Sequence, residues 1–99
     1  MAQTKTTIKP NLKLAEPPSY NVIYVNDDQT SMEFVVASLM EYFSHDKIGA
    51  VNLCMKVHEE GSAIVAVLPY EIAEQRAVEV TRSARGQGFP LLVRIEPDA

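Results

Sequence analysis

Three polar residues that could do chemistry, Asn26, Asp27 and Asp28, follow directly after the apolar run YNVIYV (residues 20–25). Side chains of these types bond to their own backbone in turns, so turn chemistry is one interpretation. Their oxygens could instead bind a metal ion, although hard cations need several oxygen ligands and no third carboxylate follows in this segment. An acidic pair behind a strand is also typical of phosphoacceptor receiver domains, but those are longer and need a further Asp and a Lys. Two carboxylates could finally bind a cationic ligand.

His58, in the segment KVHEEG, is the second residue with chemical potential. A histidine at the end of a helix commonly interacts with the helix dipole, so a C-terminal cap is the simplest interpretation. His45 lies in a turn between two predicted helices and has no evident partner. Cys54 falls on a predicted buried face without a base beside it, and the sequence has no G-x-S-x-G and no glycine-rich phosphate loop. We therefore expect neither catalysis nor a cofactor.

Composition and charge limit the classes of protein to which the chain can belong. Its 99 residues fit one domain, and a hydrophobic share of 46% is ordinary for a globular protein. The net charge of −4 argues against nucleic acid as a partner, because a phosphate backbone attracts a basic surface. One cysteine cannot form an internal disulfide. No apolar run approaches the roughly 20 residues of a membrane span, and the N-terminus lacks a secretory signal, so we expect a cytoplasmic protein.

The first 18 residues differ from the rest of the chain. They contain three lysines against one glutamate, three threonines and three prolines, and they show neither a helical nor a strand period. This composition predicts a flexible N-terminal extension that ends at Pro17-Pro18. The core domain is expected over residues 19–99.

Six elements are predicted in the core domain. A strand covers residues 20–25, and a helix follows in TSMEFVVASLMEYF, where Thr30 and Glu33 fit a capping box. The apolar face of this helix is expected at Met32, Val35, Val36, Leu39, Met40 and Phe43.

A second helix is expected from about Asp46 to His58, with an apolar side at Ile48, Val51, Cys54, Met55 and Val57. SAIVAVL (residues 62–68) is typical of a buried strand, and a third helix should begin after Pro69 and end at Gly86. That helix carries a stripe of small side chains at Ala73, Ala77, Val80 and Ala84. The alternation in LLVRIE predicts a last strand. The order β-α-α-β-α-β predicts an α+β fold, with a three-stranded, mainly antiparallel sheet packed against three helices.

Four segments together resemble the ClpS family, the small bacterial and plastid adaptors that deliver N-degron substrates to the Clp AAA+ unfoldase. The segments are VNDDQTSMEFV, VHEEGSAIV, YEIAEQRA and FPLLVRIE, and the resemblance spans about residues 18–96. It implies a fold similar to the C-terminal domain of the ribosomal stalk protein. It also implies a non-catalytic, monomeric adaptor that binds substrate N-termini beginning with Phe, Leu, Tyr or Trp.

The resemblance implies a role for the residues singled out above. Asn26, Asp27, Asp28 and His58 would hold the free α-amino group of the substrate, which offers three donors to their acceptors. A hydrophobic pocket for the first side chain would be formed by Tyr24, Val25, Thr30, Met32, Val35, Cys54, Val57 and Leu91. Met32 would exclude β-branched side chains.

The resemblance also implies a protein partner. Glu71 and Arg76 match positions that contact the N-domain of the unfoldase, and the N-terminal extension would engage the unfoldase. Two rival interpretations remain: a small metal-dependent hydrolase that uses Asp27, Asp28 and His58, or a purely structural module like the stalk domain.

Overall fold

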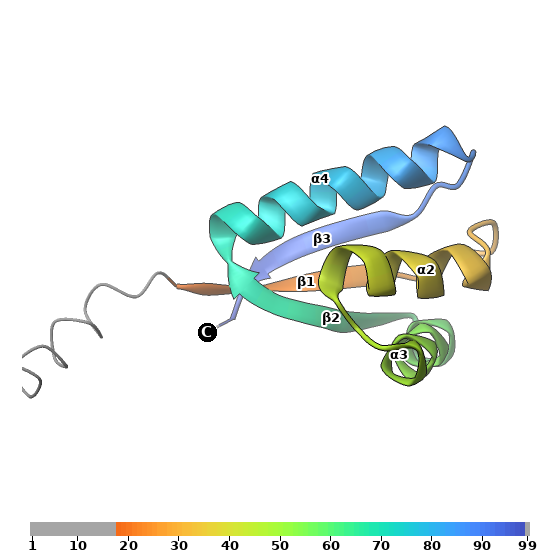
Figure 1. Ribbon diagram of the computed structural model, residues 1–99, viewed down its shortest axis with the longest axis horizontal. Coiled ribbons are helices and arrows are strands. Elements are labelled where there is room, and N and C mark those ends of the chain that lie inside the picture. The colour runs from red at the N-terminus through yellow and green to blue at the C-terminus, as the bar shows by residue number, and fades with distance from the viewer. Residues whose placement is uncertain (1–17, 99) are drawn as a thin grey trace, which may run out of the picture.

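A computed structural model describes residues 18–98 and shows a three-stranded sheet with helices on one face and along one edge (Figure 1). The expectation of a flexible extension over residues 1–18 falls almost entirely outside the described residues. The elements follow the predicted order β-α-α-β-α-β: β1 (Ser19–Val25), α2 (Met32–Phe43), α3 (Lys47–Glu60), β2 (Ser62–Pro69), α4 (Tyr70–Gly86) and β3 (Leu92–Pro97).

β1 is the central strand, and both of its neighbours pair with it in antiparallel fashion in the order β2-β1-β3. Val22 lies opposite Ala66 on one side and Ile95 on the other. A bulge in β2 lets Val65 and Ala66 both face the core. All pairings are antiparallel, so the predicted fold class is confirmed.

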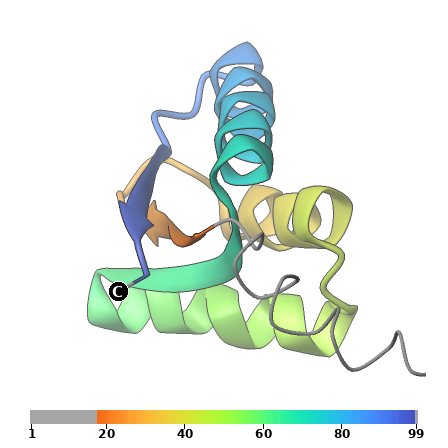
Figure 2. The ribbon, with the colours of Figure 1, turned by 90° about the vertical axis from the view of Figure 1, so that its left-hand side faces the viewer.

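The helices cover one face of the sheet. Figure 2 looks along the strands and shows α2 and α4 on the same side of the sheet, with α3 running alongside β2. The small stripe on α4 is fully buried as predicted, at Ala73, Ala77, Val80 and Ala84. Small side chains let this helix lie close to the sheet. The loop after β1, the start of α2 and the end of α3 meet at one end of the molecule (Figure 1).

Two details of α2 and its surroundings differ from the predictions. The N-cap is Ser31, whose Oγ accepts from the Phe34 N–H at 3.0 Å, and not Thr30. The Thr30 hydroxyl donates to Asp27 instead. His45 also has a partner that the sequence did not show, since its Nε2 lies 2.7 Å from the carbonyl oxygen of Val65 on β2. A carbonyl only accepts, so His45 Nε2 carries the proton.

The predicted apolar side of α3 is only partly buried. Ile48 is 74% exposed, and Val51 and Met55 are exposed as well. The buried residues are Ala50, Cys54 and Val57. A helix that lies along the edge of a small sheet buries a narrow stripe, and short side chains suffice to fill it. Among the described residues, no helix combines the length and the apolar character that crossing a bilayer requires.

Candidate functional site

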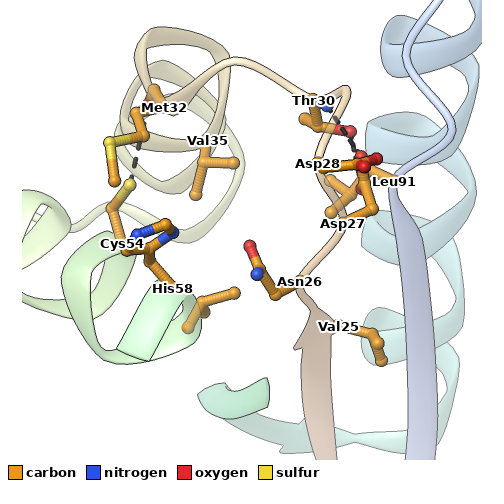
Figure 3. A pocket seen from close by; sticks show the side chains of 11 residues that line it. Val25, Asn26, Asp27, Asp28, Thr30, Met32, Val35, Cys54, His58 and Leu91 are labelled. Atoms are coloured by element: carbon orange, nitrogen blue, oxygen red, sulfur yellow. Dashed lines mark hydrogen bonds between the residues drawn. The ribbon is translucent and has the colours of Figure 1, made fainter. Parts of the chain in front are cut away.

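A cavity of about 270 Å³ opens where the loop after β1 faces α2 and α3 (Figure 3). It is lined by Val25, Asn26, Asp27, Asp28, Thr30, Met32, Val35, Cys54, Val57, His58 and Leu91. The structure thus brings together all of the expected amine-binding and pocket residues except Tyr24. They come from three separate stretches of the chain, residues 25–35, residues 54–58 and Leu91, which only the fold makes neighbours.

Asp27 organises the loop between β1 and α2. Its Oδ1 accepts from the backbone N–H groups of Gln29 at 2.8 Å and Thr30 at 2.7 Å, and its Oδ2 accepts from the Thr30 hydroxyl at 2.8 Å. Burial by itself would raise the pKa of the Asp27 carboxyl, but these three hydrogen bonds outweigh it and hold the pKa below its usual value. The Asp27 carboxylate is therefore occupied by its own loop. Asp28 is exposed and takes no part in these bonds.

Asn26 and His58 lie near one another because the backbone ties their segments together. The Asn26 N–H donates to the Gly61 carbonyl at 2.9 Å, and Gly61 is the C-cap of α3. Gly61 has a φ of 89°, which suits glycine, and its N–H donates to the Val57 carbonyl. The helix is thus capped by its own backbone at Gly61, while His58 lies in the last turn, where a histidine can interact with the helix dipole. Figure 3 shows the Asn26 and His58 side chains projecting into the space between the end of β1 and α3.

The interior of the cavity is apolar. Val35, Cys54, Val57 and Leu91 are buried, whereas Met32 at the start of α2 is 42% exposed. The Cys54 thiol donates to the Met32 carbonyl at 3.7 Å, a contact that ties α3 to the first turn of α2. Burial raises the pKa of this thiol, which favours its neutral form in the wall of the cavity.

Tyr24 does not line the cavity, although it was expected to. Its side chain is fully buried behind the cavity, and its hydroxyl lies 2.7 Å from Ser38 Oγ on α2. Residues of a strand alternate between its two faces, so Val25 and Tyr24 cannot both present their side chains in the same direction. Ser38 was not singled out in the sequence. The sequence feature that could have indicated Ser38 is a small polar residue within the apolar face of a predicted helix.

Glu71 and Arg76 lie on α4. Two hollows flank them, and Ile72 contributes to both: one is formed with Pro69, Tyr70 and Glu71, the other with Tyr42, Phe43 and Arg76. Arg76 also pairs with Glu79 at 3.0 Å, with both side chains more than one third exposed. The structure therefore places the two expected partner-binding residues on either side of an exposed apolar side chain.

The residues of the cavity suit a ligand that is cationic at one end and apolar at the other. Residues 18–98 hold no group of three or more His, Cys, Asp or Glu side chains that could bind a metal ion. Asp27, Asp28 and His58 do not form such a group, so the metal-dependent hydrolase has no support.

The fold and this cavity define a small α+β domain with a pocket whose mouth is polar and whose interior is apolar. Residues 15–94 match the family described as ATP-dependent Clp protease adaptor protein ClpS. The adapter protein ClpS of Pectobacterium carotovorum is 42% identical over 95 residues, which cover 96% of this chain and 90% of the relative. The adapter protein ClpS of Wolinella succinogenes is 38% identical over 92 residues, which cover 93% of this chain and 90% of the relative.

A solved structure gives the same result. Agrobacterium tumefaciens ClpS2, bound to L-phenylalaninamide, superimposes with a TM-score of 0.80 at 37% identity, covering 84% of this chain and all of the other. The chain belongs to the ClpS family of Clp protease adaptor proteins.

Proposed function

We propose that the protein is a non-catalytic adaptor that binds the free α-amino group and the large hydrophobic first side chain of N-degron substrates. It delivers them to the Clp AAA+ unfoldase. The observation that carries the proposal is the cavity itself, in which Asn26, Asp28 and His58 lie at the mouth of an apolar interior. L-phenylalaninamide, the ligand of the related ClpS2, has the same two features, an amine and an apolar side chain. Saturable binding of a fluorescent peptide with a free N-terminal Phe tests the proposal.

Within this proposal the two aspartates have different roles. Asp28 accepts directly from the ammonium group, because its carboxylate is free of the loop's own hydrogen bonds. Asp27 acts indirectly, because its two oxygens already bind Gln29 and Thr30. His58 and the Asn26 amide supply neutral acceptors.

Substitution of the two aspartates should separate these roles. Asp28→Asn should weaken peptide binding by about 1.5–3 kcal/mol, the usual contribution of a hydrogen bond to a charged group, without changing the urea midpoint of unfolding. Asp27→Ala should lower stability as well, because it leaves two backbone donors and one hydroxyl without their acceptor. If both variants lose affinity at unchanged stability, Asp27 contacts the ligand directly.

The stability effect of Asp27 should depend on pH. Its pKa is lowered on folding, so Asp27 contributes stability above its unfolded-state pKa of about 3.9, and this contribution is lost as the pH falls through the folded-state pKa. Urea unfolding of the wild type should show this acid-induced loss, and Asp27→Ala should show less of it.

Substitution of His58 should weaken peptide binding. His58→Ala removes one of the neutral acceptors proposed for the ammonium group, so peptide affinity should fall by about 1–3 kcal/mol without a change in the urea midpoint of unfolding. His58→Gln keeps a neutral acceptor and should bind more tightly than His58→Ala. Anisotropy titrations of the three proteins measure the effect, and equal affinities of the wild type and His58→Ala would remove His58 from the site.

The contact with the unfoldase is proposed to involve Glu71 and Arg76, with Ile72 between them. Glu71→Ala and Arg76→Ala should each weaken binding to the isolated N-domain of the unfoldase several-fold while leaving peptide affinity unchanged. Arg82→Ala, an exposed arginine farther along α4, is the matched control. Equal effects of all three substitutions would indicate a general charge effect instead of a docking site.

The N-terminal extension is proposed to engage the unfoldase during delivery.

A further inference from the structure

Two buried polar side chains connect the central strand to the wall of the pocket. Tyr24 on β1 and Ser38 on α2 are 0% and 2% exposed, and their hydroxyl oxygens lie 2.7 Å apart. The Ser38 hydroxyl donates to the carbonyl oxygen of Val35 at 2.8 Å. A serine has only one proton to donate, so Tyr24 is the donor to Ser38. The connection therefore runs in one direction, from Tyr24 through Ser38 to the backbone of Val35.

Both ends of this connection adjoin the pocket. Val35 lines it, and so does Val25, which follows Tyr24 in the strand. The ring of Tyr24 also contacts Phe43 edge-on, at a centroid distance of 6.2 Å, near the other end of α2. The phenol thus lies between β1 and the second half of α2. On the opposite side, the Cys54 thiol holds the Met32 carbonyl.

We infer that the Tyr24–Ser38 pair is a positioning element that holds the α2 wall of the pocket at a set distance from β1 and thereby determines which first side chains fit. This inference rests on the proposed function and extends it to residues that do not touch the ligand. A hydrogen bond has a narrow range of length, whereas apolar contacts between a strand and a helix tolerate small displacements. A wall held by such a bond discriminates side chains by size more sharply than a wall held by packing alone.

The experiment compares peptides that differ only in a first residue of Leu, Phe, Tyr or Trp. Tyr24→Phe retains the ring and leaves Ser38 bonded to Val35, so the variant should fold. The ratio between its tightest and weakest dissociation constants should shrink by about threefold or more relative to the wild type, since a misfit of one methylene changes affinity roughly tenfold. Tyr20→Phe removes a phenolic hydroxyl from the same face of the same strand and should leave the ratio of dissociation constants unchanged.

A second pair of variants separates positioning from stability. Ser38→Ala leaves the Tyr24 hydroxyl buried without an acceptor and should lower the thermal midpoint of unfolding. Adding Tyr24→Phe removes that hydroxyl, so the double variant should regain stability. The double variant has no Tyr24–Ser38 hydrogen bond between β1 and α2, however, and should keep the reduced selectivity.

Three results would overturn the inference, and the last can be told apart from the first two. If the wild type discriminates among the four peptides and Tyr24→Phe discriminates equally well, the pair is only structural. The same conclusion follows if selectivity returns together with stability in the double variant. If the wild type binds none of the peptides, the proposed function fails, and the selectivity role fails with it.

Discussion

A peptide with a free N-terminal phenylalanine should bind on the order of 100-fold more tightly than the same peptide with an acetylated α-amino group. Acetylation removes the positive charge and two of the three donors that the proposed acceptors at Asn26, Asp28 and His58 would use. It also adds a carbonyl and a methyl group at the polar mouth of the cavity. The apolar interior, formed by residues such as Val35 and Leu91, is unaffected by this change. The difference between the two peptides therefore reports on the mouth of the cavity and not on its apolar interior.

The measurement is fluorescence anisotropy with the two peptides under identical conditions. A third peptide, with a free N-terminal glycine, retains the amine and lacks the side chain, so it should also bind weakly. If the acetylated peptide binds as well as the free one, the cavity does not recognise an α-amino group. Inhibition of peptide binding by a chelator would support the metal-dependent hydrolase, whereas binding that a chelator leaves unchanged agrees with the adaptor.

Much of the fold could be predicted because strong local patterns agree with the tertiary structure. The order and type of all six elements follow from periodicity, from Gly61 and Gly86 at helix ends, and from Pro69 before α4. Ala73 and Ala84 mark the buried side of α4, since small residues at helical spacing permit close packing on a sheet. The outer side of α3 could not be predicted from its pattern. The exposure of Ile48 depends on where the helix lies beside the sheet, and a helical period does not contain that information.

The site was less accessible from the sequence than the fold. The resemblance to the ClpS family directed attention to the loop after β1 and to His58, but composition alone left turn chemistry and cation binding open. In the structure Asp27 makes the turn, whereas Asp28 is exposed and takes no part in the hydrogen bonds of that turn. Tyr24 was misplaced because a hydrogen bond to Ser38, fourteen residues away, holds it behind the cavity. Such long-range pairs are set by packing, and a single sequence does not reveal them.

Replacing Met32 should admit peptides that begin with valine or isoleucine. Met32 is the first residue of α2, lines the cavity and is 42% exposed, so its side chain forms part of the entrance and not of the floor. A β-branched first residue carries its extra methyl next to the peptide backbone, and that methyl would therefore lie at the entrance. Met32→Ala removes the obstructing atoms.

The expected gain for the valine and isoleucine peptides is about tenfold or more, the usual range for relieving a misfit of one methylene in a hydrophobic pocket. Leucine and phenylalanine peptides should change little or lose some affinity, because their branching begins one carbon deeper. Met40→Ala is the matched control: Met40 lies two turns farther along α2, is 41% exposed and does not line the cavity. It removes an equal side chain from the same helix. If Met32→Ala still rejects valine as strongly as the wild type does, the discrimination arises deeper in the pocket, at buried residues such as Cys54 and Val35.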